Sequence, residues 1–202
     1  MILKIKKMRL KYIPLVFLFI LSACVNNEKT DSQTKSEQKT EKENQVFFPV
    51  TGYIRGQLID IKEVGINPKK YTKKENKQDS LWVKSEDFEK EFGEFLHPEI
   101  DSINMVPFFS EKSFMDQTLN LVTLTYDPVK ELPDSIQWRH WDIYIDPATN
   151  AIQRIYLVKQ IAPDKKIQLT WQSGKRCKIV VLHEDKSGVS TIETETEIKW
   201  NY

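Results

Sequence analysis

The densest group of side chains that could do chemistry is the run Trp138-Arg139-His140-Trp141-Asp142. In an extended strand, alternation would place Trp138, His140 and Asp142 on one face and the other two residues on the opposite face. A histidine beside a carboxylate can serve as a general acid or base when a nucleophile lies within hydrogen-bond reach. Exposed tryptophans could instead stack on sugars or peptides. Trp138, His140 and Asp142 are therefore the candidate ligand or partner contacts.

The nominal nucleophiles for such a pair are Ser113, Ser173 and Cys177, and none of them lies in a turn typical of a nucleophile. A serine, a histidine and an aspartate occur together by chance in most chains of this length. We therefore assign no catalytic residue and predict that the chain is not an enzyme. The chain has three histidines, and none has the spacing that forms a metal-binding face, so we predict neither a metal site nor a cofactor.

Cys24 is the second residue with informative chemistry, because it ends the run Leu21-Ser22-Ala23-Cys24. Before it lie five Lys and Arg residues and then a short apolar run over 13–20, which is typical of an export signal that is removed. The apolar run is much shorter than the ~20 residues that a helix needs to cross a bilayer, so a permanent transmembrane anchor is the weaker interpretation. An ordinary secretory signal is the other alternative.

The Leu-Ser-Ala-Cys ending resembles the lipobox of bacterial lipoproteins. The resemblance implies that residues 1–23 are a signal peptide and that the mature chain begins at Cys24. It also implies that Cys24 carries diacylglycerol and that its new amino group is acylated, for example with palmitate. Several acyl chains give durable anchoring where one gives only marginal binding. We expect a lipid-anchored protein of a bacterial membrane, with the outer membrane preferred to the inner one.

The mature chain is mildly acidic and begins with a polar segment. Removal of residues 1–23 takes away five basic residues and no acidic one, so the formal net charge falls from +1 to −4. This balance argues against a nucleic-acid surface. Between residues 25 and 45 only Val25 is apolar, which predicts that residues 24–45 form a disordered tether behind the lipidated cysteine. With Cys24 modified, Cys177 has no partner for an intramolecular disulfide.

Residues 46–202 are long enough for one globular domain. Apolar residues near one helical face predict a helix over about 50–61, and a second helix is predicted over 86–96, where three phenylalanines share a face. The Lys-rich segment 67–80 is predicted to be an exposed loop.

After residue 105 the pattern changes to strands separated by short turns, which predicts an antiparallel meander. Alternation predicts one buried face and one solvated face, and the acidic row Glu193, Glu195 and Glu197 is interpreted as a solvated face that protects a sheet edge. The expected strands span 113–126, 138–145, 152–161, 166–172, 177–183 and 191–200.

These elements predict an α+β fold in which two N-terminal helices pack on a curved antiparallel meander of about six strands. An up-and-down β-barrel is the alternative, because the same strands could curl until the sheet closes around an apolar cavity.

Several segments resemble uncharacterised lipoproteins from Bacteroidota-type bacteria, over most of the folded domain. The resemblance implies a class and a location and carries over no catalytic residue. The hairpin after Tyr144-Ile145-Asp146-Pro147 is also similar to the sheets of small periplasmic modules such as PepSY-type domains. The segments that carry the first resemblance are 47–58 (FFPVTGYIRGQL), 79–83 (DSLWV), 114–118 (FMDQT) and 138–147 (WRHWDIYIDP).

We therefore expect a membrane-anchored, non-enzymatic lipoprotein of the bacterial cell envelope. It would bind a protein partner or an envelope component through a sheet edge or an exposed aromatic patch. The alternative is a carrier that holds a lipid or another apolar ligand inside the curved sheet. A hydrolase that uses His140 and Asp142 is the third hypothesis, and it requires a nucleophile beside that pair.

Overall fold

The computed structural model describes residues 46–201. The predicted signal peptide over 1–23, Cys24 and the predicted tether over 24–45 lie outside the described residues. Among the residues that are described, no helix combines the length and the apolar character that crossing a membrane requires.

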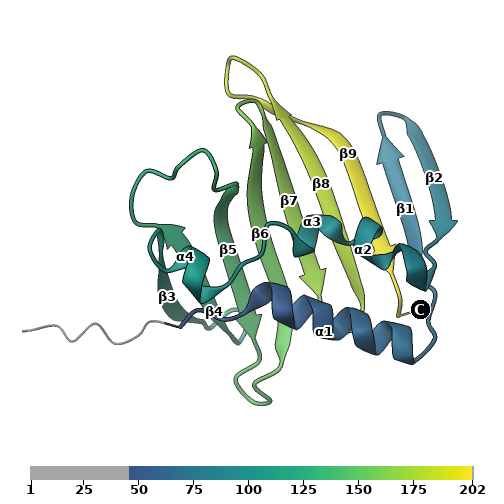
Figure 1. The fold of residues 1–202 in the computed structure, drawn as a ribbon, viewed down its shortest axis with the longest axis horizontal. Coiled ribbons are helices and arrows are strands. Elements are labelled where there is room, and N and C mark those ends of the chain that lie inside the picture. The colour runs from purple at the N-terminus through teal and green to yellow at the C-terminus, as the bar shows by residue number, and fades with distance from the viewer. Residues whose placement is uncertain (1–45, 202) are drawn as a thin grey trace, which may run out of the picture. The chain divides into compact units, whose positions relative to one another are not determined.

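The described chain forms a nine-stranded antiparallel sheet (Figure 1). The strand order is β2-β1-β9-β8-β7-β6-β5-β4-β3, so the strands from β3 to β9 follow one another as a meander and the first hairpin pairs with the last strand. The strands are β1 (Lys69–Lys74), β2 (Lys77–Trp82), β3 (Phe109–Asp116), β4 (Leu121–Pro128), β5 (Trp138–Ile145), β6 (Ile152–Ala162), β7 (Lys165–Gln172), β8 (Arg176–Glu184) and β9 (Ser190–Lys199).

The prediction of an α+β fold with an antiparallel sheet is confirmed, but the expected number of about six strands was too small. The sheet is also not closed into a barrel: β2 lies at one edge and β3 at the other, each paired with a single neighbour in the described chain.

The Lys-rich segment is a hairpin and not the predicted loop. Its strand β1 lies against β9, where Lys73 faces Glu195 and Tyr71 faces Glu197 across the two strands. Opposite charges on neighbouring strands stabilise a sheet, whereas the sequence prediction relied on apolar alternation, which β1 lacks. The turn after β1 is tight because Glu75 adopts a positive φ of 53°.

The segment 113–126 was predicted as one strand and instead forms parts of two. The carboxylate of Asp116 accepts hydrogen bonds from the backbone N–H groups of Thr118 and Leu119, which turns the chain after β3. Asn120 then takes a left-handed φ of 52°, a conformation that asparagine tolerates well, and β4 begins at Leu121.

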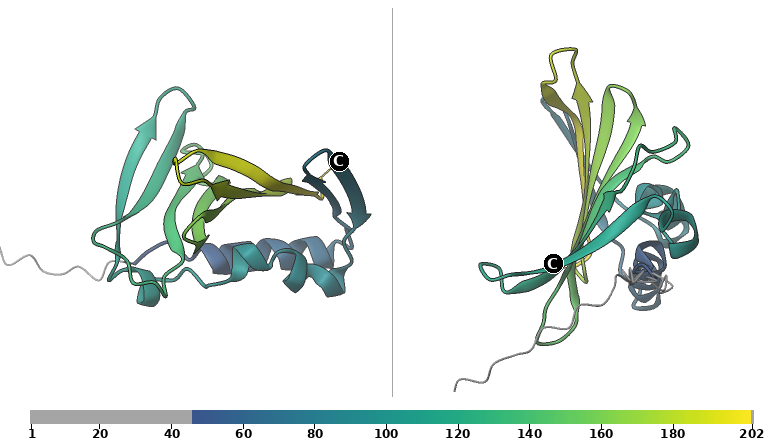
Figure 2. Two further views of the ribbon diagram at one scale, coloured as in Figure 1. Left: turned by 90° about the horizontal axis from the view of Figure 1, so that it is seen from above. Right: turned by 90° about the vertical axis from the view of Figure 1, so that its left-hand side faces the viewer.

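All helices cover one face of the sheet, as the two views of Figure 2 show. The predicted helix near the start of the domain is α1, whereas the helix expected over 86–96 is divided because Phe92 leaves the helical conformation (φ −105°, ψ 6°). Its apolar side chains are nevertheless buried. The helical elements are α1 (Val50–Glu63), the 3₁₀ turn η1 (Ser85–Asp87), α2 (Phe88–Glu91), α3 (Gly93–Leu96) and α4 (Ser102–Met105).

The space between these helices and the sheet is filled by large aromatic side chains. Trp171 of β7 has edge-on contacts with Phe92 and Phe95, with ring centroids 5.9 and 5.4 Å apart. Trp141 of β5 stacks on Tyr126 of β4 at 4.9 Å. Aromatic pairs in such geometries add to the free energy gained by burial. The largest buried side chains are Trp138, Trp141, Trp171, Tyr126, Phe47, Phe92, Phe95 and Phe109.

The opposite face of the sheet, which we call the open face, carries the charged residues. Glu195 and Glu197 of β9 point there and form ion pairs with Lys178 and Arg176 of β8, at 3.0 and 2.8 Å. The solvated-face interpretation of the acidic row therefore agrees with this placement. Its proposed role in protecting an edge was wrong, because β9 has a strand on each side.

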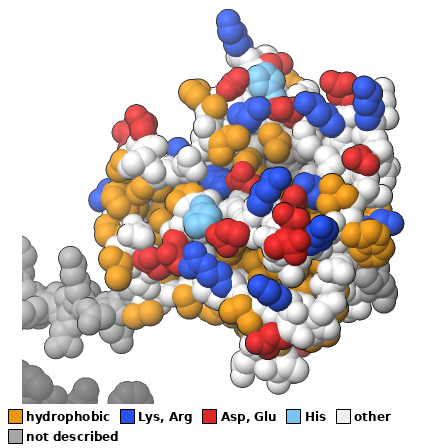
Figure 3. All heavy atoms as spheres, turned by 45° about the vertical axis from the view of Figure 1, so that its right-hand side comes forward, with side chains coloured by type: hydrophobic (Ala, Val, Ile, Leu, Met, Phe, Trp, Pro, Cys, Tyr) orange, Lys and Arg blue, Asp and Glu red, His pale blue; other side chains and the backbone are white. Residues whose placement is uncertain are grey.

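The molecular surface in Figure 3 has acidic and basic side chains interspersed over the side shown, so no large area of one sign covers that side.

A lysine is buried in the core beneath α3. Lys159 of β6 is 3% exposed, and its Nζ donates hydrogen bonds to the backbone oxygens of Glu94 and His97 at 3.2 and 2.8 Å. The Glu94 carboxylate lies 2.5 Å away, and the ring of Trp138 lies 5.1 Å below the ammonium group. Lys159 therefore satisfies the carbonyl oxygens at the end of a short helix and fixes that helix on the sheet.

We expect Lys159→Met to reduce the free energy of unfolding by about 1–3 kcal/mol, because the substitution keeps the volume but leaves buried carbonyl oxygens without a donor. Lys166→Met on β7 is the matched control. Its half-exposed ion pair with Glu184 is expected to contribute less than about 1 kcal/mol. Urea unfolding of both variants measures the difference, and equal losses would contradict a capping role for Lys159.

Candidate functional site

A β-bulge at the start of β5 separates Trp138 from the other predicted site residues. Between Trp138 and His140 the strand advances by two residues while its neighbour β6 advances by one. A bulge of this kind shifts the alternation, so both Trp138 and Trp141 are fully buried on the helix-covered face. The expectation that Trp138 shares a face with His140 and Asp142 was therefore wrong. The indole N–H of Trp138 donates to the backbone oxygen of Pro98 at 2.9 Å.

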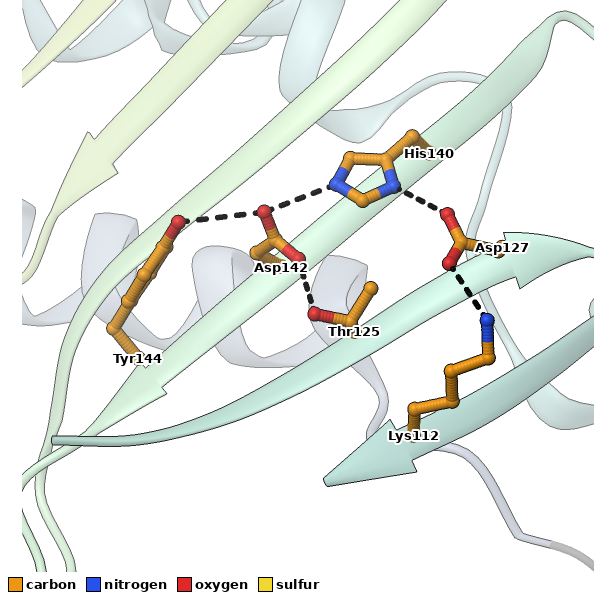
Figure 4. A network of polar contacts seen from close by, with 6 residues as sticks. All are labelled: Lys112, Thr125, Asp127, His140, Asp142 and Tyr144. Atoms are coloured by element: carbon orange, nitrogen blue, oxygen red, sulfur yellow. Dashed lines mark hydrogen bonds and ion pairs between the residues drawn. The ribbon is translucent and has the colours of Figure 1, made fainter. Parts of the chain in front are cut away.

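His140 and Asp142 do lie together, on the open face (Figure 4). The Nε2 atom of His140 is 3.0 Å from Oδ2 of Asp142, and its Nδ1 atom is 2.8 Å from Oδ1 of Asp127 at the end of β4. The other oxygen of Asp127 is 3.4 Å from the ammonium nitrogen of Lys112 on β3. Charges of alternating sign therefore run across three neighbouring strands. We call Lys112, Thr125, Asp127, His140, Asp142 and Tyr144 the polar network.

The Asp142 carboxylate is the most enclosed acid of this network, with 14% of its side chain exposed. It accepts hydrogen bonds from the hydroxyl groups of Thr125 at 2.6 Å and Tyr144 at 3.3 Å. Burial alone would raise the pKa of Asp142, but the hydrogen bonds from His140 and Thr125 outweigh burial and lower the pKa below its usual value. Asp142 is therefore a carboxylate at neutral pH.

His140 is held as an imidazolium by the two carboxylates. The hydrogen bond with Asp142 raises the pKa of His140, burial opposes this shift, and the hydrogen bond with Asp127 adds to it. The doubly protonated ring can donate one N–H to each carboxylate, whereas a neutral ring has only one N–H. Neither ring nitrogen is then free to take a proton from a nucleophile, which general-base catalysis requires.

The nominal nucleophiles lie elsewhere. Cys177 is buried in the core, where desolvation raises the pKa of its thiol well above the ordinary value, so the reactive thiolate is disfavoured. Ser173 accepts a hydrogen bond from the hydroxyl group of Tyr53 on α1. Ser113 lies on β3 opposite Leu124, one residue from Lys112 along the strand. In the described part of the chain, no group of three or more His, Cys, Asp or Glu residues is arranged to hold a metal ion.

Sequence reasoning missed the members of the network on β3 and β4. Thr125 faces Asp142 across the strands and Lys112 faces Thr125, so the three lie in one cross-strand row. Finding this row requires the register of β4 against β5, and the nine residues 129–137, which form no strand, separate the two. Asp127 lies just beyond the strand expected over 113–126, whereas in the structure it is the last charged residue of β4.

Comparisons with known proteins add no family to this description. A scan against protein-family models, a search of curated proteins and a search of solved structures each gave no match.

The raised pKa of His140 predicts how stability depends on pH. Because the folded-state pKa lies above the unfolded value of about 6.5, the contribution of His140 to stability is complete below that value and is lost as pH rises through the folded-state pKa. The difference in unfolding free energy between the wild type and His140→Gln should therefore shrink as pH rises above about 6.5. Denaturant unfolding at pH values below and above this point measures the difference, and His97→Gln, at a histidine 60% exposed, is the control. A constant or growing difference would contradict the imidazolium assignment.

Proposed function

We propose that this protein is a lipoprotein of the bacterial cell envelope that is anchored through Cys24 and binds a protein partner by strand addition at the edge strand β3. The observation that carries the proposal is the position of β3 at the edge of the sheet (Figure 1), with β4 as its one neighbouring strand among the described residues and the polar network beside it. In strand addition the partner's backbone supplies hydrogen bonds along the edge, and side-chain contacts supply specificity.

Three consecutive residues near the end of β3 carry no charge, although Lys112 and Asp116 on either side of them do. Natural edges are blocked by charged side chains, proline or bulges, yet Ser113, Phe114 and Met115 follow one another here in regular pairing with β4. The side chains of Phe114 and Met115 are 52% and 46% exposed, and Leu119 in the adjoining turn is 53% exposed. A strand added at this edge would cover apolar surface on both sides of the sheet.

The polar network adds charged contacts next to this apolar stretch. Lys112 belongs to β3 itself and is 68% exposed, and Asp127, 37% exposed, lies behind it on β4. A partner strand beside β3 would place alternate side chains over this lysine and carboxylate. Fixed charges at an interface favour one register and suppress wrong partners more than they add affinity.

The carrier alternative has less support, because large aromatic side chains fill the space between the helices and the sheet. A hollow of about 390 Å³ between α1 and α2 is lined by both apolar and charged residues, among them Leu58, Phe88 and Arg55. The hydrolase alternative has less support, because the two ring nitrogens of His140 both face carboxylates and, among the described residues, neither is hydrogen-bonded to Ser113, Ser173 or Cys177. Binding of a protein partner is therefore the hypothesis that the site supports best.

Photo-crosslinking in cells tests the edge. A photoreactive phenylalanine analogue at position 114 of the full-length chain should give one discrete adduct with a partner protein. Adding Met115→Lys should reduce the adduct about tenfold, because a charge facing the incoming strand must be desolvated. The analogue at position 81 of β2, on the opposite edge, is the matched control. Equal adducts from positions 81 and 114, or an adduct insensitive to Met115→Lys, would contradict strand addition at β3.

The anchor is tested separately with Cys24→Ala. The wild-type chain should incorporate a palmitate analogue and sediment with membranes, whereas Cys24→Ala should incorporate none and stay in the soluble fraction after a carbonate wash, since the acyl chains supply the binding free energy. A soluble, unlabelled wild type would support the ordinary secretory signal and refute the anchor.

A further inference from the structure

The other end of the open face carries cations that lie directly beside one another. Lys69 of β1 faces Lys199 of β9, and Lys199 faces Arg176 of β8 on its other side. Like charges in directly opposed positions destabilise a sheet, so this register has a cost in free energy. We call these three residues and Lys175, in the turn before β8, the cationic row.

The side chains of the cationic row are held in place by their neighbours. The carboxylate of Glu197 forms ion pairs with two members of the row, because its oxygens lie 2.8 Å from the guanidinium of Arg176 and 3.0 Å from the ammonium nitrogen of Lys199. The ammonium nitrogens of Lys69 and Lys199 lie over the ring of Tyr71, at 5.4 and 5.5 Å from its centroid. Cation–π contacts of this kind reduce the freedom of both lysines, and the charge of Lys199 is also paired with Glu197.

A surface hollow of about 490 Å³ opens next to this row, and no carboxylate lines it. Two backbone segments that line the hollow are joined by hydrogen bonds. The N–H groups of Trp200 and Asn201, after β9, both donate to the carbonyl oxygen of Lys175, before β8, at 3.1 and 3.3 Å. The hollow is lined by Gln172, Lys175, Arg176, Lys199 and Asn201. Cations and amide groups thus surround a space on a domain whose net charge is negative.

We propose that this hollow binds the phosphate group of a phosphorylated molecule. The Nε and Nη1 atoms of Arg176 donate to Gln172 and Glu197 at 2.6 and 2.8 Å, which fixes the orientation of the guanidinium. Its remaining N–H groups can donate to phosphate oxygens, and Lys175 and Lys199 supply flanking charge. A bound anion would also relieve the repulsion within the cationic row. The site lies at the opposite end of the sheet from β3 and does not depend on the function proposed above.

Calorimetric titration of the full-length protein in neutral detergent tests this site. Pyrophosphate is the soluble probe, with sodium chloride balancing ionic strength, and mixed micelles of the same detergent with phosphatidylcholine, with and without phosphatidic acid, present the same group on a lipid. We expect saturable binding of pyrophosphate, of phosphatidic acid micelles, or of both. Binding to pyrophosphate identifies a soluble phosphate ligand, and binding to the phosphatidic acid micelles alone identifies a lipid head group.

Variants decide whether the cationic row is responsible. Arg176→Gln should weaken binding about tenfold or more, because a hydrogen bond to a charged group is lost, and Arg176→Lys should lie between it and the wild type. Lys62→Gln on α1 removes the same charge on the helix-covered side and should leave binding unchanged. The absence of binding to both probes, or equal weakening by Arg176→Gln and Lys62→Gln, would overturn the proposal.

Discussion

The fold depends on covering one face of a wide antiparallel sheet. Trp138 and Trp141 of β5 and Trp171 of β7 lie on the same face of the sheet, and truncating buried aromatic residues of this size commonly costs about 3–5 kcal/mol each. The helix α1 with the short α2 and α3 covers this surface from one side (Figure 2), and Phe47 and Phe109, outside the helices, pack on Trp141. Successive side chains of a strand point to opposite faces of the sheet. Residues that alternate with the buried ones therefore lie on the open face. The polar network and the cationic row are thus consequences of the same packing.

A polar hairpin extends this sheet beyond the meander. Its strand β1 pairs with β9 in a register that sets Lys73 opposite Glu195 and Lys69 opposite Lys199. Lys70 adds a contact on the helix-covered side, 2.6 Å from Glu91 of α2. The pairing brings an early segment against the end of the chain and leaves β2 and β3 as the two edges.

The sequence predicted the elements with strong local signals. The alternation in β5 to β9, the first helix and the buried phenylalanines around Phe92 were all correctly anticipated, because each follows from the spacing of apolar residues. The β1–β2 hairpin, the turn at Asp116 and the bulge after Trp138 were missed. These features depend on partners far along the chain or on a single hydrogen-bonded turn. In the site, His140 and Asp142 were found from their spacing, but Asp127 came from a strand whose register no local pattern reveals.

The open face thus has two chemically distinct ends, with a free apolar edge at β3 and cations beside β9. Binding at the edge is the central claim, and hydrogen exchange of the full-length protein tests it most directly. Exchange should be measured in native envelope membranes and in purified, detergent-solubilised protein. We predict that the amides of β3 (Phe109–Asp116) exchange faster in the purified protein and become protected in the envelope, while those of β6 and β7 exchange alike in both. Equal exchange of β3 in the two preparations would contradict the account.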